Sequence, residues 1–166
     1  ILLALLLGPA ALVAQEPTFD TLREEGHWKL LRPRIEGWYR MKPQDPYALM
    51  WMSRLKHAFG EPEAALDLAR KAVALKGADS ELQTQLGMAA NAVRERTAFL
   101  QQLSLALEGR KALETAVASN PAHDEANNRL LRYYLNAPAI AGGSLSKARE
   151  LAQRFSQVKP ANALVF

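Results

Sequence analysis

An internal period of about 34 residues constrains this chain more than any other feature of its sequence. Glycines suited to turns stand at Gly26 and Gly60, which are 34 residues apart. Residues that stop helices follow 17 positions after each glycine, at Pro43 and Gly77. A period of this length is typical of stacked helix pairs, because one pair cannot bury its apolar face alone.

Two further units follow with the same organisation and greater length. They close at Pro121 and Pro160, which leaves roughly ten and five residues more than the period requires. We interpret the excess in the third unit as longer helices between Ser80 and Ser119. The four units are expected at residues 17–43, 46–77, 79–121 and 123–160, within a repeat domain that covers residues 15–166.

Each unit has the signals of two antiparallel helices. Asp45 is a helix N-cap followed by Pro46 at the first helical position, and Pro62 opens the partner helix after the turn at Gly60. No sustained alternation of apolar and polar residues predicts a strand. The sequence therefore predicts an all-α solenoid. The partner helix of the second unit carries a stripe of small and apolar residues at helical spacing: Ala65, Leu68, Ala69, Ala72 and Val73.

Residues 1–14 have the character of a targeting segment. The run ILLALLLGPAALV is uncharged and 13 residues long, whereas a membrane span needs about 20 residues. Polar residues follow it directly, as they do after the apolar region of a secretory signal. We predict a partial signal peptide at residues 1–14 and a periplasmic or secreted protein. The alternative is a retained membrane anchor, so contact with a membrane is expected only through an uncleaved leader.

Composition and motifs exclude several function classes. The absence of Cys excludes disulfides, thiolate metal sites and a thiol nucleophile. The net charge of +4 comes from mixed charges without a basic block, so no nucleic-acid partner is expected. His27, His57 and His123 fall in three different units, and there is no HExxH, GxSxG or P-loop motif. We predict no enzymatic activity, no cofactor and no metal.

The 34-residue pattern resembles the tetratricopeptide repeat (TPR), a helix pair with a small residue opening the second helix and proline closing it. GEPEAALDLARKAVALK, at residues 60–76, is the best match, and GGSLSKARELAQRFSQVKP, at residues 142–160, matches the same half-repeat. APAIAGGSLSKA, at residues 137–148, also resembles a loop of uncharacterised secreted bacterial TPR proteins. The resemblance implies a TPR-like α-solenoid of about four helix pairs that serves as an interaction module without catalytic residues.

The first and third units depart from the TPR pattern. The first unit has Leu31 where the pattern has alanine, and its leading helix, from about Thr18 to Glu25, is short. Pro33 is expected in or near the first turn of the following helix. In the third unit, Gly109 falls where the small residue is expected.

The TPR resemblance also implies which side chains face the concave groove. In TPR arrays these are the second, fifth, ninth and twelfth positions of the first helix of each pair. The resulting surface has polar, apolar and charged side chains with a small excess of basic ones. Such a surface suits an extended peptide or a helix with some negative charge. If Arg54 lies in this groove, Arg54→Ala leaves helicity intact. The predicted groove residues are Tyr47, Met50, Arg54 and His57 in the second unit, Glu81, Thr84, Met88 and Asn91 in the third, and Arg129, Tyr133 and Asn136 in the fourth.

Three hypotheses about function remain open. The first is an interaction or scaffolding module of the bacterial cell envelope that binds another protein or peptide in its groove. The second is a periplasmic small-ligand receptor or transport accessory protein, which a closed, mostly apolar pocket of several hundred Å³ would support. The third is self-association through the repeat ends, because the apolar residues ANALVF stand at 161–166.

Overall fold

The structure, a computed structural model, describes residues 18–159, and this part of the chain is helical without strands. The expected leader at 1–14 and the apolar segment at 161–166 lie outside the described residues. The described helices confirm the predicted all-α architecture. They are α1 (Phe19–Glu24), α2 (Trp28–Met41), α3 (Pro46–Ala58), α4 (Pro62–Leu75), α5 (Ser80–Arg94), α6 (Phe99–Ser119), α7 (Asp124–Asn136), the short 3₁₀ helix η1 (Ala139–Ala141) and α8 (Leu145–Val158).

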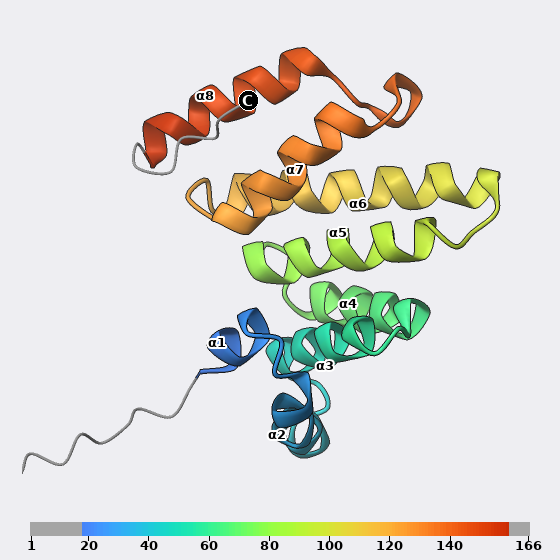
Figure 1. Cartoon of the computed structure of the whole chain (residues 1–166), viewed down its shortest axis with the longest axis vertical. Helices are drawn as coiled ribbons and strands as arrows, with labels where there is room; N and C mark the ends of the chain where they lie inside the picture. Colours follow the sequence, from blue (N-terminus) through green and yellow to red (C-terminus); the bar gives the residue numbers. More distant parts are fainter. Residues whose placement is uncertain (1–17, 160–166) are drawn as a thin grey trace, which may run out of the picture.

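The helices stack as successive antiparallel pairs from α2 at one end to α8 at the other (Figure 1). The first helices of the pairs approach one another, because α5 contacts both α3 and α7. The backbones of the described second helices, α4, α6 and α8, do not approach one another as closely. The array therefore curves, with α3, α5 and α7 on its inner, concave face. Within residues 18–159, no helix is both long and apolar enough to span a membrane.

The repeated turn chemistry of the sequence sets where the helices begin. Gly26 and Gly60 both adopt left-handed backbone conformations, with φ of 75° and 80°, which glycine reaches without strain. The Asp45 carboxylate accepts hydrogen bonds from the backbone N–H groups of Tyr47 (2.8 Å) and Ala48 (3.1 Å) and so caps α3. The predicted turns and the predicted cap at Asp45 are confirmed.

The structure confirms two of the expected departures from a regular helix pair and corrects the expected position of Pro33. The short first helix is confirmed in α1, with 6 residues. The extra length of the third unit lies mainly in α6, which has 21 residues against 14 in α4. Pro33, however, lies inside α2, which already begins at Trp28. The expectation that Pro33 lies in or near the first helical turn, where no backbone N–H is needed, is therefore wrong.

The short helix α1 packs over α3 at the start of the array. Leu22 is buried in one core cluster with Met50 and Trp51. The Phe19 ring meets the Trp51 ring edge to face, with ring centroids 5.2 Å apart. Trp38 also packs against this cluster. This arrangement determines which α3 side chains can reach the groove.

Helices α5 and α6 approach each other closely at Gly87 on α5 and Gly109 on α6. A Cβ atom placed on Gly87 would lie 2.7 Å from Cγ of Leu113 and 3.1 Å from the Gly109 carbonyl oxygen. Leu113 is itself buried and has little room to move. Packing rather than backbone conformation therefore excludes a side chain at Gly87 and leaves little room for one at Gly109, where an added Cβ would lie 3.3 Å from the Gly87 carbonyl oxygen.

Gly87→Ala is expected to lower the free energy of unfolding, although alanine favours helices. Overpacking costs about 1–3 kcal/mol, which outweighs the gain in helix propensity of about 1 kcal/mol. Gly37→Ala in α2 is the matched control, since no atom lies within 4 Å of its added Cβ. It should raise stability. Urea unfolding followed by circular dichroism checks both, and equal shifts in the two variants would contradict the close contact.

Candidate functional site

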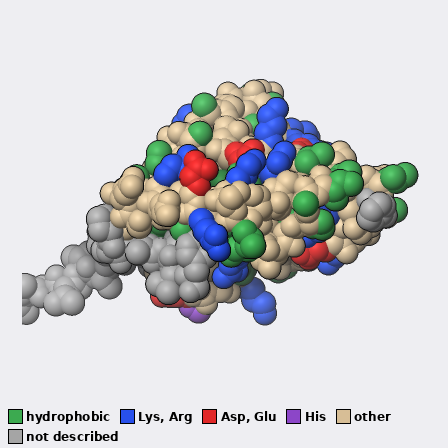
Figure 2. All heavy atoms as spheres, turned by 90° about the horizontal axis from the view of Figure 1, so that it is seen from above, with side chains coloured by type: hydrophobic (Ala, Val, Ile, Leu, Met, Phe, Trp, Pro, Cys, Tyr) green, Lys and Arg blue, Asp and Glu red, His purple; other side chains and the backbone are tan. Residues whose placement is uncertain are grey.

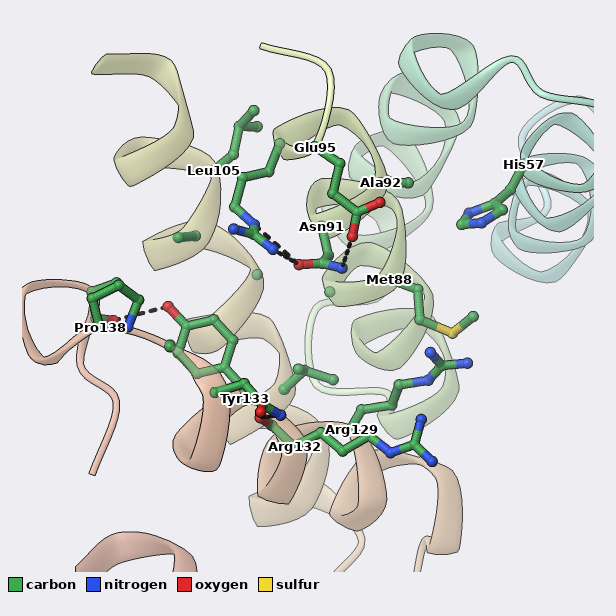
Figure 3. A pocket seen from close by; sticks show the side chains of 18 residues that line it. His57, Met88, Asn91, Ala92, Glu95, Leu105, Arg129, Arg132, Tyr133 and Pro138 are labelled. Carbon is green, nitrogen blue, oxygen red and sulfur yellow. Dashed lines mark hydrogen bonds between the residues drawn. The ribbon is translucent and has the colours of Figure 1, made fainter. Parts of the chain in front are cut away.

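A cavity of about 470 Å³ lies between α5, α6, α7 and η1 (Figure 3). Residues of α3, α5 and α7 contribute to its lining, so it lies on the concave side of the array. Six of the eleven predicted groove residues line it, and they come from all three helix pairs that the prediction used. These six are His57, Met88, Asn91, Arg129, Tyr133 and Asn136.

The apolar part of the cavity comes mainly from α6. Leu105, Ala106 and Leu113 line it and are buried. Pro138 also lines it, beside the place where the Tyr133 hydroxyl donates a 2.8 Å hydrogen bond to the carbonyl oxygen of Ala141. Figure 3 shows the Tyr133 ring directed towards Pro138. The connection between α7 and α8 is thereby held down as a wall of the cavity.

A network of polar side chains from α5 forms one rim. Nε and Nη2 of Arg94 donate hydrogen bonds of 3.1 and 2.8 Å to Oδ1 of Asn91. Nδ2 of Asn91 donates in turn to Oε1 of Glu95 at 3.3 Å. Asn91 is thus fixed between a cation and an anion, and the Arg94 guanidinium faces a neutral acceptor rather than a carboxylate.

Two arginines of α7 form the facing rim. Arg129 and Arg132 are three positions apart and so share one face of the helix. Figure 3 shows both side chains reaching from α7 towards Met88 on α5. Nη2 of Arg129 lies 3.2 Å from Oε1 of Glu125. Within residues 18–159, no carboxylate lies within ion-pair distance of Arg132. The cavity therefore has an excess of positive charge, from three arginines against one glutamate.

The titratable groups at the cavity respond to burial and to this charge. Burial lowers the pKa of His57, and the positive charges of Arg129 and Arg96 lower it further, against the opposite effect of Glu95. His57 is therefore neutral at pH 7, and its buried Nδ1 has no hydrogen-bond partner among residues 18–159. Burial also raises the pKa of Tyr133, which stays a neutral donor. The arginines and Glu95 carry the charge of the site.

The predicted groove positions Met50 and Thr84 are corrected by the structure. Both side chains are fully buried. Met50 belongs to the core cluster beneath α1, and the Thr84 hydroxyl donates to the Ser80 carbonyl oxygen of its own helix at 2.7 Å. The prediction assumed an open face along all of α3 and α5. Neighbouring helices cover those positions instead.

Arg54 was also predicted to face a ligand, and it is buried, with 8% of its side chain exposed. Its guanidinium stacks over the Trp51 ring at 4.6 Å from the centroid, and Nη1 lies 3.7 Å from Oδ1 of Asp20. Burial lowers the pKa of Arg54, with a further contribution from Arg23. Arg54 is a packing residue between α1 and α3.

Tyr47 and Glu81, the last two predicted residues, line a second cleft of about 340 Å³ rather than the main cavity. The Tyr47 hydroxyl donates to Oδ2 of Asp79 at 2.6 Å and accepts from Nζ of Lys76 at 2.7 Å. These bonds tie the second helix pair to the third. The hydroxyl is therefore committed to a structural contact.

The second cleft also brings a serine and a histidine together. Oγ of Ser80 lies 2.6 Å from Nδ1 of His123 and donates to the carbonyl oxygen of Ala116 at 2.8 Å. Because the hydroxyl proton goes to that carbonyl, Nδ1 of His123 must itself be the donor to Oγ. His123 cannot then take a proton from Ser80, as nucleophilic catalysis would require. Among residues 18–159, no three His, Asp or Glu side chains are grouped so that they could hold a metal ion.

Sequence reasoning missed the residues of α6 and the connection after α7. The TPR resemblance implied groove positions on first helices alone, whereas Leu105 and Leu113 are on a second helix. The ten-residue excess of the third unit was the available signal. The fourth unit gave another one, because Arg132 follows Arg129 at a spacing that places both on one face.

The stacked antiparallel pairs, the left-handed turn glycines and the concave face of first helices define a TPR-like α-solenoid. No protein-family model matches the sequence, and no curated protein matches it. Solved structures do match. A thermophilic TPR protein of Thermus thermophilus, TTC0263, is similar at a TM-score of 0.70 and 20% identity, over 85% of this chain and 71% of that one.

Two other solved structures have the same fold. MamA matches at a TM-score of 0.60 and 21% identity, over 86% of this chain and 75% of that chain. Human IFIT1, solved as a dimer with PPP-AAAA, matches at 0.63 and 22% identity, over 81% of this chain and 30% of that chain. At these identities the likeness shows the fold, and it confirms the TPR-like architecture predicted from the repeat.

Arg54→Ala is expected to lower the free energy of unfolding by about 1–3 kcal/mol, because it removes buried packing against Trp51. This reverses the expectation of an inert surface change. Asp20→Asn is the control, since the Asp20 side chain is 59% exposed and an exposed ion pair contributes little. Thermal unfolding compares the two variants. A larger loss in Asp20→Asn than in Arg54→Ala would contradict the packing role.

Proposed function

We propose that this chain is a protein-interaction module that binds an extended segment of a partner on its concave face. The cavity between α5, α6, α7 and η1 carries the proposal, because it is a preformed recess in the face that helical solenoids use for binding. Its apolar and charged groups are held by packing and by the Asn91 and Tyr133 hydrogen bonds. Little ordering of the surface is then needed on binding.

The distribution of charge supports a partner with negative charge. Figure 2, which looks onto the α8 end of the array, shows Lys and Arg side chains spread over that face with few Asp and Glu side chains between them. Positive potential of this kind raises the rate of encounter with acidic segments. The proposal involves no reaction.

A small-ligand receptor is the second candidate. The cavity volume of about 470 Å³ falls within the usual range for small-molecule sites. Its three arginines and two asparagines make it less apolar than such sites usually are. This mixed lining is why we place the receptor second.

Photo-crosslinking tests the partner-binding face directly. A benzoylphenylalanine at Asn136, which lines the cavity, should give covalent adducts with a protein in cells of the source organism. The same substitution at Lys71, an exposed residue of α4, should give none, because α4 lies outside the concave face. Adducts at both positions, or at neither, would contradict the proposed face.

We also propose that the chain is exported to the bacterial cell envelope, on the basis of the apolar segment at residues 1–14. With Met-Lys-Lys added before Ile1, a bacterial host should release a periplasmic protein whose first residue is near Gln15. Replacing Leu5 and Leu6 with Asp should keep the chain in the cytoplasm. Fractionation and N-terminal sequencing measure both. A full-length chain in the membrane fraction would contradict cleavage, and one in the cytoplasm would contradict export.

A further inference from the structure

We propose that the cavity is a pocket for an acidic side chain of the bound segment together with an apolar side chain next to it. The inference rests on the proposed function and names the chemistry of its partner. Two features of the cavity carry it: positive charge without a carboxylate partner on both rims, and an apolar wall between them.

The walls of the pocket come from the parts of the chain that exceed a 34-residue pair. Leu105 and Leu113 belong to α6, the 21-residue helix. Pro138 belongs to the connection between α7 and α8, which includes η1 and contacts α6. The extra residues of the third and fourth units thus contribute Leu105 and Pro138 to the pocket, whereas Leu113 follows Gly109 in the regular part of the second helix.

Within the described residues, each rim of the pocket holds one arginine that is not paired with a carboxylate, although Glu95 also lies on the α5 rim and Glu125 pairs with Arg129 on the α7 rim. Arg94 is held by the neutral acceptor Asn91, and no carboxylate in the described part of the chain lies within ion-pair distance of Arg94 or Arg132. Like charges that line one recess repel each other, and a carboxylate placed there relieves the repulsion. It also gains charge-assisted hydrogen bonds from guanidinium groups. Burial is the main cause of the lowered pKa of His57, and the positive charge of Arg129 lowers it further.

The apolar wall requires more than a simple anion. Leu105 and Leu113 expose little of their side chains, but Pro138 is exposed, so an occupant with apolar carbon beside its carboxylate buries more apolar surface than an inorganic anion would. Arg132 is exposed, which leaves the pocket open to solvent on the α7 side. A peptide can therefore lay one acidic and one apolar side chain into the pocket while its backbone passes along the concave face.

A library of random dodecapeptides displayed on phage, selected against the full chain, tests the ligand chemistry. The selected pool should be enriched in Asp or Glu next to Leu, Ile or Phe. The tightest peptide is then synthesised with a fluorescein label, together with a version in which its acidic residue is replaced by the matching amide. Anisotropy titrations measure both, and the amide should bind roughly tenfold more weakly, equivalent to about 1.4 kcal/mol.

Variants of the protein identify the arginine that binds the carboxylate of the peptide. Arg132→Gln should weaken the acidic peptide about tenfold and the amide peptide little, because the amide has already lost the interaction. Arg149→Gln is the matched control: Arg149 is an exposed arginine of α8 outside the cavity, and its loss removes the same charge. It should change either affinity less than twofold. Circular dichroism confirms that each variant folds.

The outcomes separate this inference from the proposed function. A selected pool without enrichment in Asp or Glu would overturn the proposed pocket. So would additive losses of affinity when Arg132→Gln and the amide peptide are combined. Adducts at Asn136 would still support the binding face in either case. Sodium octanoate carries the same chemistry as a free acid. Suppose that octanoate binds, that no peptide is selected and that no adduct forms at Asn136. This result would contradict both the peptide pocket and the proposed function, and it would support the small-ligand receptor.

Discussion

The contact between α5 and α6 at Gly87 and Gly109 is the constraint on which the rest of the array depends. It brings the two backbones together, and it fixes how the third helix pair presents its inner face. Both glycines also line the cavity, because two positions without side chains leave space beside the contact. The same feature therefore holds the pair together and creates the recess. A side chain at Gly87 would overlap Leu113, and a side chain at either position would take up space in the cavity.

The start of the concave face is closed by charge and aromatic packing. Asp20 and Arg23 of α1 face Arg54 and Glu125 at 3.7 and 4.0 Å, so the first helix is linked electrostatically to both α3 and α7. Glu125 in turn pairs with Arg129. Exposed pairs of this kind contribute little energy singly, but together they occupy the polar groups on this part of the face. The recess beside α5 and α7 is left as the accessible part.

The sequence was sufficient for the fold because its signals were local. Turn glycines, the Asp45 cap and the helix-stopping residues each act within a few positions, and the period aligned them. The groove residues depend on which helices cover which faces, and this is not local. Met50 and Arg54 occupy the expected register on α3, yet Phe19 and Leu22 of α1 pack over that region. Leu105 and Pro138 of the pocket walls lie in departures from the repeat, which a repeat pattern cannot place.

The three arginines of the cavity are not equivalent for recognition. An anion that meets Arg129 must compete with Glu125, so the exchange replaces one ion pair by another and the net gain is small. Arg94 would keep its neutral partner Asn91 and gain a charged one. Arg132 has no partner to give up within the described residues. The apolar wall lowers the local dielectric, which strengthens any new pair relative to one on an open surface. Discrimination between a carboxylate and its amide is therefore expected to come mainly from Arg132 and Arg94, while Arg129 serves to hold Glu125 in place.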